Sequence, residues 1–104
     1  VISGKKEKVV ANEKKKRDRK GYPLKSAKFS RLPDRYMRRT IRGMLPWKNT
    51  RGKEAYKRVM CYIGIPEVIA NEKIIILEKA SAKKLPTLKY ITVGEVCKAL
   101  GGKV

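Results

Sequence analysis

The clearest helix signal in the chain lies in residues 33–46, PDRYMRRTIRGMLP. At 100° per residue, one sector of about 100° collects the basic side chains of this stretch: Arg35, Arg38, Arg39 and Arg42. The opposite side collects the apolar ones: Met37, Ile41 and Met44. Pro33 suits a first helical turn, and Pro46 disfavours a helical residue before it. The stretch therefore predicts a helix over 34–45 that docks on protein through one side and turns its arginines outward.

Positive charge is concentrated in the first part of the chain, around this helix. The chain has 28 Lys+Arg and 9 Asp+Glu, a formal net charge of +19, and residues 1–60 hold 21 of the basic and 5 of the acidic groups. No carboxylate between residues 35 and 53 balances the arginines. Such a charge density repels itself unless a polyanion offsets it. Because the pattern offers phosphate contacts and no signal for reading base edges, it favours folded RNA over a specific DNA sequence.

The residues before the helix predict a strand end, a second helix and a loop. Residues 1–2 are typical of the end of a strand, and residues 3–4 offer a turn. Residues 5–20 lack Pro and Gly, and they predict a helix that is polar nearly all round and held by something other than a protein core. The Gly-Tyr-Pro break at 21–23 ends this helix and leaves an irregular basic segment over 21–33.

The residues after the helix predict shorter elements. Thr50 offers an N-cap for a helix over 51–60. Residues 61–63 predict a short strand, and the apolar run 74–77 predicts either another buried strand or an extended segment. A Thr-x-x-Glu pattern, typical of a capping box, predicts a short helix over 92–100 that closes at a Gly-Gly pair.

The sequence lacks the residues that most catalytic and metal chemistry requires. It has no histidine to serve as a general base, and its nine carboxylates are scattered among lysines. Cys61 and Cys97 stand far apart without a CxxC pair, which excludes the usual zinc patterns and indicates two reduced, buried thiols in a reducing intracellular setting. The longest apolar run, 74–77, is too short to span a membrane. We therefore expect no enzyme, no cofactor, no metal site, no small-molecule substrate and no membrane partner.

Three aromatic side chains stand among the basic residues: Tyr22, Phe29 and Trp47. Unpaired bases of RNA stack on such rings. Aromatic rings also anchor loops to a small core. The sequence leaves both interpretations open for each ring.

Residues 39–66 resemble a known protein family. The run Arg-Thr-Ile-Arg-Gly-Met-Leu-Pro at 39–46, the Arg-Gly pair at 51–52 and the run Tyr-Ile-Gly-Ile-Pro at 62–66 closely resemble the universal large-subunit ribosomal protein L13 family. The stretches VISGKK at the start of the chain and GYPLKS after the first predicted helix are also similar to that family. The tail over 67–104 is similar to its archaeal and eukaryotic branch.

The resemblance implies an α/β fold, with a small parallel sheet flanked by helices and with extended basic segments. It also implies binding to large-subunit ribosomal RNA beside neighbouring ribosomal proteins, in the cytoplasmic ribosome, and a part in early subunit assembly. Family members carry a further strand and helix before the position of Val1, and these elements are absent from this sequence. Either this chain starts late or part of the fold is missing.

We interpret residues 1–104 as a single ribosomal-protein domain, with a basic RNA-facing helix and loop over 5–33 and a C-terminal extension over 67–104. An RNA-binding regulator of translation outside the ribosome is the alternative, and a DNA-compacting protein is a further one. The resemblance implies a motif turn that itself binds RNA, formed by Gly43, Met44, Leu45 and Pro46, with further RNA contacts around it at Arg38, Arg39, Arg42, Lys48, Arg51 and Lys53. Charge and composition add the remaining expected RNA contacts: Lys5, Lys6, Lys14, Lys15, Lys16, Arg17, Arg19, Lys20, Lys25, Lys28, Arg31, Arg35 and Trp47.

Overall fold

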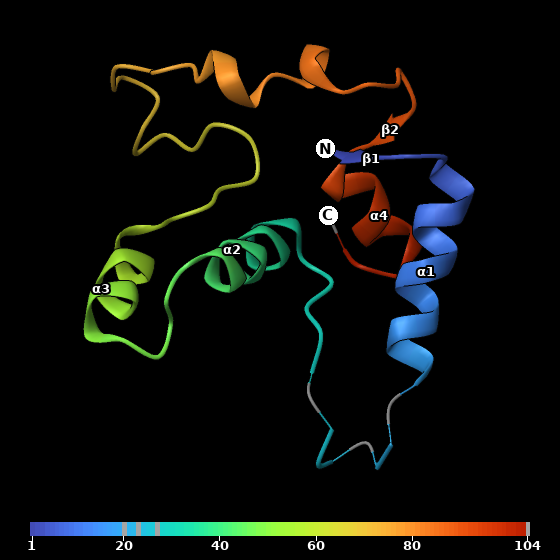
Figure 1. Cartoon of the computed structure of the whole chain (residues 1–104). Helices are drawn as coiled ribbons and strands as arrows, with labels where there is room; N and C mark the ends of the chain where they lie inside the picture. The colour runs from blue at the N-terminus through green and yellow to red at the C-terminus, as the bar shows by residue number, and fades with distance from the viewer. Residues whose placement is uncertain (20, 23, 27, 104) are drawn as a thin grey trace.

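The computed structural model describes residues 1–19, 21–22, 24–26 and 28–103. Long extended segments join its helices, and one short sheet brings the two ends of the chain together (Figure 1). In chain order the elements are β1 (Ile2–Ser3), α1 (Lys6–Asp18), α2 (Pro33–Met44), α3 (Thr50–Arg58), the 3-10 turns η1 (Glu78–Ala80) and η2 (Ala82–Lys84), β2 (Tyr90–Ile91) and α4 (Val93–Ala99). Lys20 and Pro23, which the sequence pattern singles out, lie outside the described residues.

The sheet is antiparallel, so the prediction of a parallel sheet is wrong for the described residues. Ile2 pairs with Ile91 and Ser3 with Tyr90, and the Gly4 amide extends the ladder by donating to the Lys89 carbonyl at 2.9 Å. A parallel pair needs two strands that run in the same direction, joined by a crossover. The expected strand at 61–63 does not form, and the run 74–77, expected as a strand or an extended segment, forms no strand. The fold is therefore a mixture of helices with a two-stranded antiparallel sheet.

The core is small and centres on α4, which lies between α1 and α2 (Figure 1). Its buried apolar side chains come from β2 and α4: Ile91, Val96 and Leu100. Three partly buried side chains pack against them: Ile2, Val9 and Val10. The two valines correct the expectation that helix 5–20 is held by something other than a protein core. Two adjacent valines form only a narrow stripe, but a narrow stripe is enough for a core of this size.

The ends of α4 follow the local sequence signals. The Thr92 hydroxyl accepts from the Glu95 amide, and the Glu95 carboxylate accepts from the Thr92 amide, so the predicted capping box is confirmed. At the other end the Gly101 amide donates to the Lys98 carbonyl and the Gly102 amide to the Cys97 carbonyl, which is a Schellman motif. Gly101 has a φ of +90°, a conformation that favours glycine.

Helix α2 has the expected bounds, but its buried side differs from the prediction. It starts at Pro33 and ends before Leu45, as the two prolines indicate. It packs against α4. Of the three apolar side chains expected to dock on protein, Ile41 is half-buried, whereas Met37 is 40% exposed and Met44 74%. The core therefore covers only part of the expected apolar side.

Helix α3 folds back on the turn that precedes it. Asn49 stands at its N-cap instead of the expected Thr50, and neither residue's side chain makes a capping hydrogen bond. A Cβ atom on Gly52 would overlap the Pro46 carbonyl group, so glycine is required at this close approach. The Trp47 ring meets the Tyr56 ring edge to face, with centroids 4.9 Å apart. These contacts join the 45–49 turn and α3 into one unit.

The segment over 59–89 is extended and covers little apolar surface. The side chains of 74–77 are between 70% and 82% exposed, so of the two alternatives expected for this run, the buried strand is wrong. A strand needs a neighbouring strand to accept its backbone hydrogen bonds, and none lies beside this segment among the described residues. Cys61 is only half-buried, contrary to expectation, whereas Cys97 is buried as expected. Among the described helices, none has the length and apolar character required to cross a membrane.

Candidate nucleic-acid interface

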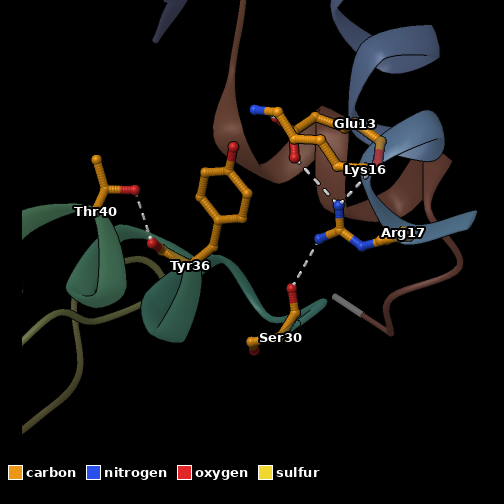
Figure 2. Close-up of polar contacts among 6 residues, drawn as sticks. All are labelled: Glu13, Lys16, Arg17, Ser30, Tyr36 and Thr40. Carbon is orange, nitrogen blue, oxygen red and sulfur yellow. Dashed lines mark hydrogen bonds and ion pairs between the residues drawn. The ribbon is translucent and has the colours of Figure 1, made fainter. Parts of the chain in front are cut away.

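Helix α1 is tied to the following loop by a buried charged network (Figure 2). Arg17 is only 8% exposed, and its Nη1 group donates to the Glu13 carboxylate at 3.1 Å while its Nη2 group donates to the Ser30 carbonyl at 3.1 Å. Lys16 donates to the other carboxylate oxygen of Glu13, also at 3.1 Å. Burial favours the neutral form of Glu13, but the hydrogen bonds from Lys16 and Arg17 outweigh burial and lower the pKa of this carboxyl group. Arg17 thus joins α1 to residue 30 and leaves little of its charge for solvent.

Tyr36 of α2 lies beside this network. Its ring points from α2 toward Glu13 (Figure 2), and its carbonyl group accepts from the Thr40 hydroxyl at 3.0 Å. Burial raises the pKa of the Tyr36 hydroxyl, and the negative charge of Glu13 raises it further. The phenol therefore stays neutral. Tyr36 lines one hollow together with Glu13 and Arg17 of α1 and with Arg39 of α2.

Two of the four α2 arginines are held by α3 and the turn before it. The Arg38 Nε group donates to the Val59 carbonyl at 3.0 Å, and its guanidinium lies 4.5 Å from the centre of the Tyr56 ring. The Arg42 guanidinium lies 5.2 Å from the centre of the Trp47 ring. Cation–π contacts of this kind fix the direction of a guanidinium and leave most of its N–H donors free. Both side chains are therefore pre-oriented and half-buried.

The other two α2 arginines, Arg35 and Arg39, are exposed to solvent. Arg39 donates to the Lys28 carbonyl at 3.4 Å and its guanidinium lies 5.6 Å from the centre of the Phe29 ring. Arg17 approaches the same ring from inside at 5.6 Å, so Phe29 separates a buried arginine from an exposed one. Arg35 is exposed. None of the four α2 arginines forms an ion pair within the part of the chain that the structure describes.

The motif turn at 43–46 borders a shallow cationic hollow of about 400 Å³. The Trp47 amide donates to the Leu45 carbonyl at 2.8 Å and the Asn49 amide to the Pro46 carbonyl at 3.0 Å, which fixes the turn. The hollow is lined by Arg42, Gly43, Leu45, Pro46, Trp47, Lys48 and Asn49. No carboxylate is among these lining residues, so the hollow is positively charged.

Most of the remaining basic residues expected to contact RNA lie at the surface. Two of them have acidic neighbours, since Lys6 pairs with Glu95 at 3.6 Å and Lys16 with Glu13. The exposed residues of this set are Lys5, Lys6, Lys14, Lys15, Lys16, Arg19, Lys25, Lys28, Arg31, Lys48, Arg51 and Lys53. Arg17 is the exception, because it is buried, and Lys20 lies outside the described residues.

Sequence reasoning missed Tyr56, which supports both Arg38 and Trp47. Tyr56 was expected only as part of a helix over 51–60, because nothing in the sequence shows which residues of α2 and α3 meet. Of the three aromatic side chains with two open interpretations, Phe29 and Trp47 hold arginines, and Tyr22 is 61% exposed. Among the described residues, no cluster of three or more potential metal-binding side chains is present.

Comparisons with known proteins point to one family. A family model described as "Ribosomal protein L13" matches residues 1–68. Two proteins named "Large ribosomal subunit protein uL13" are similar to nearly the whole chain. The one from Archaeoglobus fulgidus is 42% identical over 97% of this chain and 65% of its own length. The one from Methanocaldococcus jannaschii is 41% identical over 99% of this chain and 73% of its own length. A third, from Methanococcoides burtonii, is 44% identical over 72% of this chain and 54% of its own length. This chain thus spans roughly half to three quarters of these relatives, whose names are those of a ribosomal protein and not of an enzyme.

Proposed function

This chain belongs to the ribosomal protein L13 family, and on that premise we propose that it is a structural constituent of the large ribosomal subunit. It acts in translation, within the cytoplasmic ribosome. Its partners are large-subunit ribosomal RNA and neighbouring ribosomal proteins. Residues 1–104 act as one ribosomal-protein domain, with 5–33 facing RNA and 67–104 forming a C-terminal extension.

The chain binds ribosomal RNA chiefly through phosphate groups. The observation that supports this most directly is the arginine side of α2, where four guanidinium groups have no acidic partner among the described residues and three make contacts within the protein. A guanidinium pairs two phosphate oxygens at once, and a pre-oriented one loses less conformational entropy on binding. Each phosphate neutralised also releases condensed counterions, which contributes a favourable entropy at low salt. Lys16 of α1 lines one hollow together with Arg39, and Lys48 lines the cationic hollow together with Arg42.

A part in early subunit assembly is consistent with the charge of the chain. With a net charge of +19 and a core of few side chains, the folded chain repels itself. RNA phosphates remove that repulsion, and the protein in turn holds RNA segments together. Protein and RNA therefore stabilise each other as soon as the binding site is transcribed.

The test measures the affinity of the full chain for transcribed archaeal large-subunit ribosomal RNA over a series of salt concentrations. One variant replaces all four α2 arginines with glutamine (R35Q, R38Q, R39Q, R42Q). A control variant removes the same charge from the C-terminal extension (K73Q, K79Q, K83Q, K84Q). We expect the arginine variant to bind much more weakly and its log–log salt slope to fall by about 3, at roughly 0.7–0.9 per lost phosphate contact. The control should change little.

Equal losses in the two variants would show that net charge alone determines binding, which would contradict the proposal. Circular dichroism must show that both variants remain folded. Co-sedimentation from cell extracts separates the other functions: a subunit protein travels with large subunits at moderate salt and leaves them at high salt. A regulator outside the ribosome would remain in free fractions, and a DNA-compacting protein would follow DNA.

A further inference from the structure

Gly43 occupies a helical position where the fold does not require glycine. It lies in the last turn of α2, its φ is not positive, and a Cβ atom added to it would meet no atom within 4 Å. A glycine inside a helix is roughly 1 kcal/mol less favourable than an alanine. By contrast, a Cβ atom on Gly52 would overlap Pro46, and one on Gly102 would overlap Arg31. Internal packing explains those two glycines but explains neither Gly43 nor Gly94, and of these two only Gly43 lines the cationic hollow.

The surface around Gly43 indicates what approaches it. Gly43 is one wall of the cationic hollow, which also receives Lys48 and the Arg42 guanidinium that rests near Trp47. Met44, beside it, is 74% exposed, so the surface next to the glycine is open. A ligand for this place is anionic, because cations and no carboxylates line it. It is also a ligand that comes close to a helix backbone, because only a hydrogen atom stands on the Gly43 Cα atom.

We infer that the sugar–phosphate backbone of RNA lies in this hollow and contacts the Gly43 Cα atom directly, at a distance that a side chain would prevent. The inference rests on the proposed function and adds to it a point of closest contact. Arg42 and Lys48 hold the phosphate on either side of the turn. Gly43 itself contributes no charge and no hydrogen bond. Its part is to let the chain of riboses and phosphates sit deep enough to reach both cations.

The test is a pair of matched substitutions, Gly43→Ala and Gly94→Ala, in the full chain. Gly94 lies in a terminal turn of α4, its φ is not positive, and it too has open space where a Cβ atom would stand. Each variant is examined by thermal unfolding and by binding to transcribed archaeal large-subunit ribosomal RNA. Both should unfold at the same temperature as the unchanged chain or about 4 °C higher, since alanine favours the helix.

Only Gly43→Ala should bind RNA more weakly, by roughly tenfold, which is the effect of one methyl group forced into a packed contact. Its salt slope should stay unchanged, because no charge is lost. An Arg42→Gln variant provides the opposite pattern, with a salt slope smaller by roughly 0.7–0.9.

Three results would overturn the inference. If the original chain binds the RNA well and Gly43→Ala binds it equally well, the inference is wrong and the proposed function stands. A Gly43→Ala variant that fails to fold would show that the glycine serves the fold. Failure of the unchanged chain to bind the RNA at low salt would contradict both the inference and the proposed function.

Discussion

The region around α4 and the extended segment over 59–89 both contain runs of aliphatic side chains, yet only the first buries them. Val96 of α4 is fully buried, with β2 and α1 packed on it, whereas Ile75 in the apolar run is 81% exposed. The difference lies in the partners. Residues from both ends of the chain meet at α4, because β1 pairs with β2 and sets the start of α1 beside it. Apolar composition therefore does not create a core unless another element faces it.

We expect the largest change in the free energy of unfolding when one isoleucine from each region is truncated to alanine. Ile91→Ala should lower the free energy of unfolding by about 2–5 kcal/mol, because it leaves a cavity in a core of few side chains. Ile75→Ala should change it by less than about 0.5 kcal/mol, because that side chain is already in water. Urea denaturation followed by circular dichroism measures both. Similar losses in the two variants would show that the 74–77 run is packed in solution.

The buried network at Glu13 predicts a smaller loss with a pH signature. Arg17→Met should destabilise the fold by about 1–3 kcal/mol, since it leaves the Glu13 carboxylate without its buried partner. Lys16→Met removes a lysine that is 62% exposed, and should cost no more than about 1 kcal/mol. The contrast between the two isolates the contribution of burial.

The pH signature follows from the lowered pKa of Glu13. Its usual value is 4.5, and the folded chain holds it below that, so the ionised carboxylate stabilises the fold above pH 4.5. That contribution is lost as the pH falls through the folded pKa. We expect the unchanged chain to lose stability on acidification below pH 4.5, and the Arg17→Met variant to lose less over the same range. Parallel pH profiles for the two proteins would contradict this role of Arg17.

The smallest effect compares one threonine from each region. Thr92→Ala removes the hydroxyl group of the capping box on α4 and should cost about 1 kcal/mol. Thr87→Ala removes the hydroxyl group that accepts a hydrogen bond from the Lys89 amide in the exposed segment. It should lower the free energy of unfolding by only about 0.3 kcal/mol. The midpoints of denaturant unfolding should differ in that order. A reversal would place more structure at 87–89 than at the start of α4.

Local sequence signals correctly predicted the parts of the structure that depend on contacts between residues within about four positions of each other. The bounds of α2, the capping box at Thr92 and the glycine closure of α4 all agree with the sequence. Each of these depends on backbone conformation and on hydrogen bonds inside one turn. The family resemblance, carried by short contiguous runs, also agrees with the comparisons.

Features that depend on pairing between distant residues could not be read in this way. Among the described residues, neither 61–63, expected as a strand, nor 74–77, expected as a strand or an extended segment, forms a strand, and the sheet instead joins residues 2–3 to residues 90–91. Arg17 looked like one more surface cation until α1 and residue 30 enclosed it. Tyr56 became a support for Arg38 only because α3 lies beside α2.

The sequence by itself determined where the charge lies, which stretches form the longer helices and to which family the chain belongs, because these follow from composition and from contacts along a few residues. The tertiary structure alone decided which cations face water, that Arg17 is buried, which valines reach the core, and which glycines have open space instead of a neighbour. The reason is physical: burial and close approach are properties of two surfaces that meet, and a linear sequence specifies each surface without showing which other one it meets.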